Sequence, residues 1–500
     1  MLKLRRVAID SWRQSIAYLH RGCVAYSPDE YLGPAKIEIL PTGARNGHSL
    51  RATLNRVDTD GLIAVDELGL SPHGFDRLGL PEGAMVTLER AQTPKSLDAL
   101  RAKIAGNVLD ADEIDAVISD IVSERYTGSE ISAFLMSAAT ALTSGEILGL
   151  ARARARHATA MEWPDTLVAD KHSMGGIPGN RVTLVVIPII AAHGIAIPKA
   201  SSRAITSAAG TADTMEVLAR VDLDADQVQR VVKEARGCIV WNGKLNHSPV
   251  DDVMNAVTRS LGIDSNRLSV ASILSKKLAA GATHVVIDIP VGPTAKIRGA
   301  AEACEMAAQF EDVGEGLGLT VVSRITDGSA PVGRGVGPVL EARDVMQVLS
   351  NAPGAPDDLR EKSLAFAAQI IAFDPKFGAG DGMERARELL ESGAALSAMN
   401  RIIDLQGRNP MPPEPGPLQQ EVPAPATGVI SGIDCWRISG IARRAGAPRD
   451  KTAGIDLLKK IGDPVSEGEP LYRIHASADA DFAAARDAAD GDNGFHIEDD

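Results

Sequence analysis

The sequence predicts a multidomain α/β protein built around one mainly parallel α/β domain. Its 500 residues exceed what one ordinary hydrophobic core holds, so several domains are expected. Beyond residue 163, short apolar runs alternate with helical patterns, which is typical of a parallel sheet covered by helices on both faces. The patterns before and after this stretch differ from it. We therefore expect domains at 1–95, 96–162, 163–408 and 422–476, a linker at 409–421 and a tail at 477–500.

The first 95 residues show short alternating apolar runs, which Gly, Pro, Asn and Asp interrupt. The runs at 36–40, 62–65 and 85–88 have the period of half-buried strands. We expect a small β-rich domain here, which ends at the linker 91–94.

Residues 96–162 change to a helical period. Three positions carry a capping-box pattern, in which an Asp or Thr precedes a Glu by three residues and the two side chains satisfy each other's free backbone N–H groups. The pairs are Asp110 with Glu113, Thr127 with Glu130, and Thr143 with Glu146. The sequence therefore predicts a small helical domain.

Strands and helices alternate between residues 163 and 408. The expected strands are 167–169, 195–198, 285–289 and 319–322, and the expected helices are 181–193, 224–236 and 269–280. A polar, small-residue motif follows each of the first two strands. Because ligands of open parallel sheets bind at the carboxyl ends of the strands, we expect the two motifs to form the site.

The first motif is DKHSMGGIPGN, residues 170–180, and it combines a cation, an imidazole, a hydroxyl and three glycines. Glycines let backbone N–H groups approach an anion closely, the following helix N-terminus adds positive partial charge, and Lys171 adds a full charge. Phosphate is the expected ligand. The alternative is a tight turn with an exposed lysine.

The second motif is SSRAITSAAGTADTME, residues 201–216, which places five hydroxyl side chains around one arginine within eleven residues. Hydroxyl and N–H groups can bind a phosphate or a sugar. The alternatives are a run of caps and turns, and a structural ion pair between Arg203 and Glu216. Two such motifs one βαβ step apart favour a shared ligand site.

Both motifs, together with ASILSKKL at residues 271–278, resemble the thymidine phosphorylase and pyrimidine-nucleoside phosphorylase family. The usual forms in that family are DKHSTGG, SGRGxxHTGGTxDxxE and ASILAKKL. The three motifs occur in the family's order, and the resemblance runs from about residue 97 to about residue 476. The long N-terminal segment and the amino-acid sequence of the second motif are closer to the branch that contains archaeal AMP phosphorylases and their bacterial relatives.

The resemblance implies a role for each matching residue. The phosphate contacts would be Lys171, Ser173, Gly176, Thr183, Ser201 and Thr211. The nucleoside or nucleotide contacts would be Ser202, Arg203, Thr206, Ser207, Ser260 and Ser272. The catalytic residues would be His172, Asp252 and Lys276.

Two of these residues, His172 and Asp252, are candidates for the proton donor. An ordinary histidine pKa of about 6.5 suits His172 as a general acid. In the AMP phosphorylase branch, an acid at the position of Asp252 is the donor. As alternatives to catalysis, Asp252 could be a helix N-cap and Lys276 part of a solvated helix face.

The implied function is a phosphate-dependent pentosyltransferase, nominally a thymidine phosphorylase that converts thymidine and phosphate to thymine and 2-deoxy-α-D-ribose 1-phosphate. The alternative within the family is an AMP phosphorylase, which makes adenine and ribose 1,5-bisphosphate. The alternative of a different class is a non-catalytic binding or assembly protein on the same fold. Ser207 replaces the family's His, and Val257 stands where the family's pyrimidine-gripping Arg is expected, so the base stays open.

The composition excludes several classes of binding partner. Aromatic residues make up 3% and the formal net charge is −14, so we expect no nucleic-acid surface. The sequence shows no signal peptide, no run of ~20 apolar residues and only four widely separated cysteines, so we expect a cytoplasmic protein without membrane, disulfide or metal sites. The expected ligands are small molecules, with inorganic phosphate as co-substrate and no cofactor. The family's helical domain implies a homodimer or higher homo-oligomer.

Residues 422–476 contain the phrases PAPATGVI and GDPVSEGEPL, which resemble the barrel-sandwich hybrid of biotinyl and lipoyl domains. The lysine hairpin tip of those domains is missing, so we expect an α+β structural appendage rather than a cofactor carrier. From Asp479 to Asp500, eight acidic residues stand against Arg486, which is half of the net charge. This tail is expected to be disordered.

Overall fold

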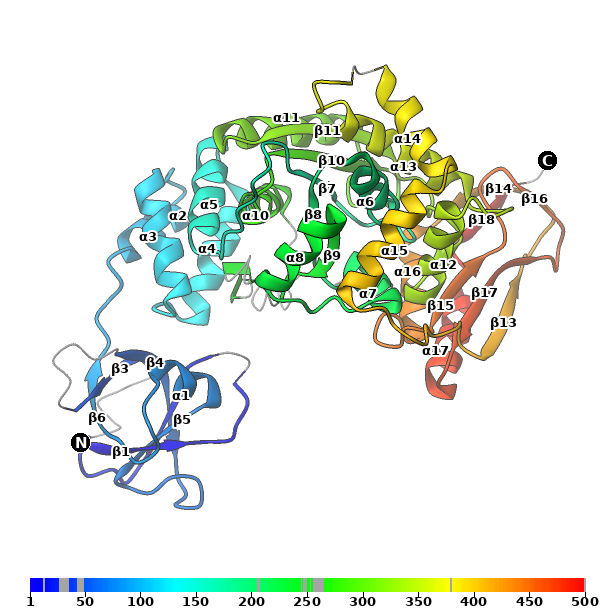
Figure 1. The fold of residues 1–500 in the computed structure, drawn as a ribbon. Coiled ribbons are helices and arrows are strands. Elements are labelled where there is room, and N and C mark those ends of the chain that lie inside the picture. Colours follow the sequence, from blue (N-terminus) through cyan, green and yellow to red (C-terminus); the bar gives the residue numbers. More distant parts are fainter. Residues whose placement is uncertain are drawn as a thin grey trace. The chain divides into compact units, whose positions relative to one another are not determined.

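The computed structural model describes residues 1–500 except 12–13, 27–35, 43–48, 205–206, 244, 246–249, 252, 255–264, 378–379 and 499–500. The chain divides into two compact units, which are described separately (Figure 1). Unit 1 comprises Met1–His157 and Pro249–Ser269, and unit 2 comprises Ala158–Ser248 and Val270–Asp500. Residues 249–269, expected within the α/β domain, thus group with unit 1.

The N-terminal part of unit 1 is a closed β-barrel with the strand order β1-β5-β2-β4-β3-β6. Its strands are β1 (Leu2–Arg6), β2 (Ile16–His20), β3 (Lys36–Pro41), β4 (Leu50–Val57), β5 (Glu67–Leu70) and β6 (Met85–Arg90), and helix α1 is Pro72–Leu78. Alternate side chains such as Ile37 and Ile39 fill the interior, as the period of two requires. The prediction of a strand at 62–65 is wrong. Ile63 is buried there, but the chain turns, and the Glu67 carboxylate accepts a hydrogen bond from the Ala64 N–H at 2.9 Å.

The rest of unit 1 is helical, and all three predicted capping boxes are present. The helices are α2 (Leu97–Ile104), α3 (Ala111–Val122), α4 (Gly128–Thr140) and α5 (Ser144–Arg156). Glu146 does more than cap α5, because its carboxylate also holds the buried Lys103 ammonium at 2.6 Å. Such a pair costs desolvation but fixes how α2 and α5 meet.

The centre of unit 2 is a parallel sheet (Figure 1). Its strands are β7 (Ala169–Ser173), β8 (Ile197–Ser201), β9 (Gly237–Trp241), β10 (His284–Val291) and β11 (Thr320–Asp327). The pairs β11-β10-β7 and β8-β9 are parallel, and a parallel bridge between Val168 and Ala196 joins the two groups. The mainly parallel sheet that the sequence predicts is confirmed, and both motifs begin inside its strands.

Helices cover this sheet and supply most of its core. They are α6 (Val182–His193), α7 (Thr211–Leu218), α8 (Ala225–Ala235), α10 (Asn266–Ala279), α11 (Ala300–Gly316), α12 (Pro338–Leu349), α13 (Asp357–Ile371), α14 (Asp381–Glu391) and α15 (Ala394–Gln406). Helix α6 is apolar on every side, so it must be enclosed. It shares one buried cluster with residues of α13, α14 and α15, which anchors its N-terminus firmly behind the first motif. Among the described residues, no helix is both long and apolar enough to cross a bilayer.

The C-terminal part of unit 2 is a module of two small sheets and two helices, which we call the C-terminal module (residues 418–498). Its elements are β13 (Leu418–Pro423), β14 (Gly428–Ile433), α16 (Cys435–Arg444), β15 (Gly454–Leu457), β16 (Pro464–Val465), β17 (Pro470–Ala476), α17 (Asp479–Gly491) and β18 (Phe495–Glu498). One sheet has the order β12-β15-β17-β13, in which β12 (Gly335–Val336) comes from the α/β domain. The other has the order β16-β14-β18.

The acidic segment expected to be a disordered tail is folded instead. Residues 479–491 form α17, and β18 pairs antiparallel with β14. Ala485, Ala489 and Phe495 are buried, and Phe495 stacks on Tyr472 with ring centroids 5.7 Å apart. The expectation rested on net charge, whereas α17 buries Ala485 and Ala489 on one side and carries Asp479, Asp487 and Asp490 on its exposed side.

Candidate active site

The two motifs lie at the carboxyl ends of β7 and β8, where α6 and α7 begin. Lys199 of β8 donates to the backbone oxygen of Lys171 in β7 at 2.7 Å, which ties the two strands together. Arg181, at the end of the first loop, reaches the second motif, with one nitrogen 3.4 Å from Thr211 Oγ1 and another 3.3 Å from Ala209 O. Two helix N-termini and a buried guanidinium therefore converge on one edge of the sheet, an arrangement that favours an anion.

The first loop can follow its path only with glycine. Gly175, Gly176 and Gly179 have φ angles of 79°, 89° and 68°. A Cβ on Gly179 would lie 2.2 Å from Val332 O, and a Cβ on Gly176 would lie 3.1 Å from Lys296 N. The three glycines thus have left-handed conformations, and Gly176 and Gly179 lie close to neighbouring backbone; the predicted approach of the loop's N–H groups to an anion stays a prediction.

Lys171 is not an exposed lysine, since its side chain is 1% exposed. Its ammonium lies 3.4 Å from Asp288 Oδ2 and 4.7 Å from the centre of the Phe366 ring. The Asn180 side-chain amide donates to both Asp288 Oδ2 at 3.3 Å and Ser173 Oγ at 3.4 Å, so this charge lies at the base of the glycine loop. Burial above all, together with the nearby Lys362 and Lys199 cations, lowers the pKa of Lys171 to about 8 although Asp288 opposes the shift.

Asp288 organises this cluster from within the sheet. It is fully buried and accepts a hydrogen bond from Thr326 Oγ1 at 2.6 Å. The cations of Lys171 and Lys362 and the hydrogen bonds from Thr326 and Asn180 outweigh burial, which alone would raise the pKa, and hold the pKa of Asp288 at about 2. The carboxylate is therefore charged under all ordinary conditions and keeps the two lysines in place.

A second buried cluster lies behind β7. The Asp170 carboxylate accepts hydrogen bonds from Lys199 at 3.0 Å and from Lys277 of α10 at 2.8 Å. Burial and the neighbouring Lys199 cation lower the pKa of Lys277 to about 7. Asp170 thereby fixes α10, and with it Ser272 and Lys276, against the strand that carries His172.

His172 lies in a strongly electropositive environment. Burial lowers its pKa well below 6.5, and the charges of Lys277, Lys199, Lys276 and Lys171 lower it further. The expectation that an ordinary pKa suits His172 as a general acid is therefore wrong, because its imidazole is neutral at neutral pH. On α10, the Lys276 ammonium donates to Ser272 Oγ at 3.0 Å, so these two predicted residues do lie together.

The second motif is held by ion pairs. Arg203 donates to both Glu216 oxygens, at 2.5 and 2.6 Å, and to Asp213 Oδ1 at 3.2 Å, while its guanidinium stacks on Trp241. The structural ion pair offered as an alternative is thus present. Lys451 of the C-terminal module joins it, at 2.8 Å from Glu216 and 3.1 Å from Asp213.

The remaining predicted residues are distributed around these clusters. Ser201 ends β8 and Ser202 is exposed after it, Ser207 Oγ donates to Ala209 O at 2.9 Å, and Thr211 and buried Thr183 lie in the first turns of α7 and α6. Thr206, Asp252 and Ser260 lie outside the described residues. The structure therefore brings together His172, Lys171, Ser173, Ser201, Thr211, Ser272 and Lys276 at one region of unit 2, and gives no position for the proposed acid Asp252.

Sequence reasoning missed three residues of the site. Arg181 and Asp288 each carried a local signal, because a cation at a helix start and a carboxylate inside an apolar strand are both unusual. Lys451 carried none, since its partner Asp213 is 238 positions away.

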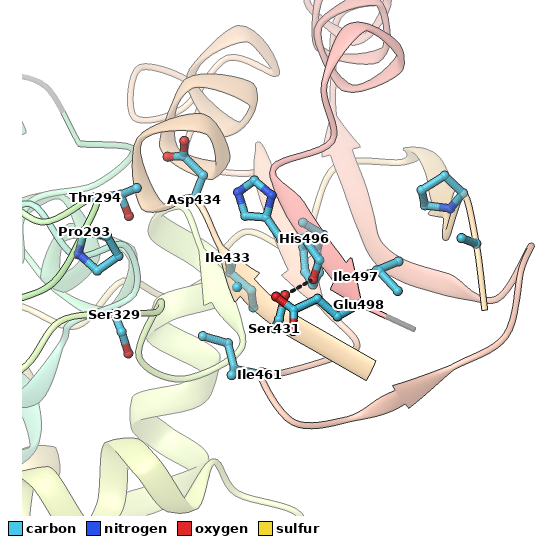
Figure 2. Close-up of a pocket in the computed structure, with 14 residues that line it drawn as sticks. Pro293, Thr294, Ser329, Ser431, Ile433, Asp434, Ile461, His496, Ile497 and Glu498 are labelled. Atoms are coloured by element: carbon cyan, nitrogen blue, oxygen red, sulfur yellow. Dashed lines mark hydrogen bonds between the residues drawn. The ribbon is translucent and has the colours of Figure 1, made fainter. Parts of the chain in front are cut away.

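A cavity of about 770 Å³ lies elsewhere in unit 2, between loops of the α/β domain and the C-terminal module (Figure 2). Pro293, Thr294 and Ser329 line one side, and Ser431, Asp434, His496 and Glu498 are among the residues of the other. On that second side, Ser431 Oγ of β14 donates to His496 O of β18 at 3.4 Å. None of the predicted site residues that the structure describes lines this cavity, so it is distinct from the phosphate region.

Comparison with known proteins gives consistent matches along the chain. Residues 97–158 match the family described as "Glycosyl transferase family, helical bundle domain", residues 165–396 its "a/b domain", and residues 429–495 the "Pyrimidine nucleoside phosphorylase C-terminal domain". Anthranilate phosphoribosyltransferase from Thermus thermophilus shares the fold with a TM-score of 0.54 at 20% identity, covering 62% of this chain and 99% of its own.

Relatives match over nearly the whole chain. A protein of Rhodopseudomonas palustris named "Putative thymidine phosphorylase" is 52% identical, covering 99% of this chain and 96% of its own. One of Methylococcus capsulatus with the same name is 51% identical over 100% of this chain and 96% of its own. A "Bifunctional ribose 1,5-bisphosphokinase-thymidine phosphorylase" of Azorhizobium caulinodans is 54% identical, covering 99% of this chain and 71% of its own. The chain therefore belongs to the thymidine and pyrimidine-nucleoside phosphorylase family of pentosyltransferases.

Proposed function

We propose that this phosphorylase cleaves thymidine with inorganic phosphate, giving thymine and 2-deoxy-α-D-ribose 1-phosphate. The observation that carries the proposal is the cationic base of the glycine loop. Lys171 and Arg181 are buried, and the N-termini of α6 and α7 point to the same edge of the sheet. Charge placed before the substrate arrives needs no reorganisation when charge moves in the transition state.

In this proposal the anion is bound by the first loop, with Ser173, Gly176, Thr183, Ser201 and Thr211 as further donors around Lys171. Phosphate attacks the anomeric carbon as the glycosidic bond breaks, and the departing base takes up negative charge. His172, neutral at neutral pH, donates a hydrogen bond to the base, and the Lys276 and Ser272 pair lies beside it. The lysines around His172 favour negative charge on the leaving base.

An AMP phosphorylase is the second candidate. The fused relative carries in its name an activity on ribose 1,5-bisphosphate, which is the sugar product that phosphorolysis of AMP would yield. Arg203 argues the other way, because Glu216 and Asp213 already hold the guanidinium that was expected to meet a 5′-phosphate. Asp252 as proton donor belongs to this candidate. A non-catalytic protein is not retained, because the family is one of enzymes.

The deciding experiment incubates the purified protein with phosphate and, separately, thymidine, uridine, deoxyuridine, AMP, CMP and UMP, and measures released base by chromatography. We expect thymine release with the highest kcat/KM. Robust adenine release from AMP without thymidine cleavage would overturn the assignment in favour of the second candidate. Release of no base from any substrate would overturn both.

Two further assignments follow from the family. We propose a homodimer or higher homo-oligomer, to be tested by light scattering. We also propose that the C-terminal module is a barrel-sandwich-like fold without a carried cofactor, since Lys451 is engaged with Asp213 and Glu216 rather than presented at a hairpin tip.

A further inference from the structure

The C-terminal module contacts the second motif directly and the first loop through residues 331–333 of the α/β domain. The sequence predicts a structural appendage, but the side chains of Lys451 and Lys460 extend from the module and bind residues of the α/β domain. Each lysine binds the part of the α/β domain that fixes one of the two loops.

Lys451 holds the second motif through Asp213. Asp213 Oδ2 accepts hydrogen bonds from the N–H groups of Ala204 at 2.7 Å and Gly210 at 2.9 Å, which closes the two ends of the loop onto α7. Its other oxygen receives Lys451 at 3.1 Å, and Lys451 also reaches Glu216 at 2.8 Å. Asp213 is 2% exposed, so the lysine supplies a positive charge to a buried carboxylate.

Packing joins the same loop to the module. Ala208 is 1% exposed and belongs to the hydrophobic cluster formed by Val422, Ile438, Ile455 and other core residues of the module. The backbone of Lys451 is itself fixed, because its oxygen accepts the N–H of Val339 at the start of α12. The lysine is therefore presented from a rigid position rather than from a free loop end.

Lys460 holds the first loop indirectly, through residues 331–333 of the α/β domain. Its ammonium donates to Pro331 O at 2.9 Å, to Gly333 O and to Asp358 Oδ2 at 2.9 Å. Between those two carbonyls, the Val332 N–H donates to Pro178 O of the glycine loop at 3.1 Å. Val332 O is also the atom that leaves no room for a Cβ on Gly179.

We propose that Lys451 and Lys460 are positioning residues of the phosphorylase site, through which the C-terminal module holds the second and first motif loops in their ligand-binding conformation. The proposal rests on the proposed function for its effect on catalysis. The positioning itself does not depend on which substrate is cleaved.

The test compares Lys451→Met and Lys460→Met with Lys459→Met in the full chain. Lys459 is a matched control, because it is the sequence neighbour of Lys460 and pairs only inside the module in the described contacts, with Glu469 at 2.5 Å and Pro464 O at 3.1 Å. Two readouts are used: amide hydrogen exchange of peptides that contain Ala204 and Gly210 or Gly175 and Gly179, and kcat/KM for phosphate and for thymidine. Lys451→Arg, which keeps the charge, serves as the rescue variant.

We expect faster exchange at the second motif in Lys451→Met and at the first loop in Lys460→Met, with kcat/KM lowered about 10- to 100-fold, because small displacements of positioned groups have effects of this size. Lys451→Arg should restore at least part of the loss, and Lys459→Met should match the wild type in both readouts. Unchanged exchange in both loops would overturn the proposal whatever the activity. Faster exchange with unchanged kcat/KM would also overturn it, since the loops would then need no such support. If the wild type cleaves no nucleoside, the proposed function fails, whereas exchange still decides whether the two lysines hold the loops.

Discussion

Lys171 combines near-complete burial with a pKa of about 8, and this makes its charge sensitive to mild alkali. Below a pH of about 8 the Lys171 ammonium is charged and favours phosphate binding, whereas above that pH the charge is lost. We expect kcat/KM for phosphate to fall above pH ~8, because that parameter reports the free enzyme's ionisations.

The variant Lys171→Ala should lack this alkaline limb and retain turnover lowered by roughly 10²- to 10³-fold, the usual cost of removing one charge stabiliser. Steady-state kinetics from pH 6 to pH 10 and circular dichroism of both proteins provide the measurement. Wild-type-like phosphorolysis by Lys171→Ala would contradict the phosphate site.

His172 offers a contrast, since four lysines and burial lower its pKa well below 6.5. A neutral imidazole that donates a hydrogen bond can be replaced in part by an amide, whereas a general acid cannot. We therefore expect His172→Gln to retain about tenfold more activity than His172→Ala, since a hydrogen bond to a developing charge contributes more than a neutral one. Equal loss in both variants, with a wild-type rate that falls as pH rises through 6.5, would instead indicate a general acid.

The loop between β7 and α6 is the element whose shape the site most depends on. Gly175 and Gly179 both have left-handed φ angles, but only Gly179 faces a backbone oxygen, at 2.2 Å from an added Cβ. Gly175→Ala should cost about 1 kcal/mol of folding free energy, the usual penalty for a left-handed non-glycine residue. Gly179→Ala should cost more and lower kcat/KM for phosphate, because the loop must also move away from Val332. Equal melting temperatures for the two variants would contradict this reading.

Local signals made the elements predictable. Each capping box needs only two residues three positions apart, and the helices after Asp110, Thr127 and Thr143 begin as predicted. The position of both motifs at strand ends is predictable too, because each motif follows closely on its expected strand in the sequence. The strand at 62–65 failed because a short apolar run around buried Ile63 also suits a turn that closes over a core.

The charge environment of the site could not be predicted in the same way. Asp288 acts on Lys171 from 117 positions away, and the four lysines that lower the pKa of His172 come from β7, β8 and α10. Sequence supplies the residue types, whereas the pKa depends on which of them the fold places side by side. The choice of Asp252 or His172 as proton donor depended on this missing information.

At the scale of the whole molecule, the acidic C-terminal segment contributes to stability. Phe495 and His496 are neighbours on β18, one 8% exposed against Tyr472 and the other exposed. Phe495→Ala should lower the free energy of unfolding by about 3 kcal/mol, as for other large-to-small core changes, and His496→Ala by less than about 0.5 kcal/mol. Thermal melts of both variants test this, and equal melting temperatures would show that the segment is not docked.

The insertion of Ala208 into the core of the C-terminal module has a consequence for biosynthesis. A chain grows from its N-terminus and its domains generally fold in that order. The strands that carry the motifs end at Ser201, whereas the core to which Ala208 belongs extends to Phe495. A nascent chain therefore contains every strand of the sheet well before all the residues that share a core with Ala208 have been made. We therefore expect a chain truncated within the C-terminal module to lack the complete core around Ala208 and to have lowered phosphorolysis activity.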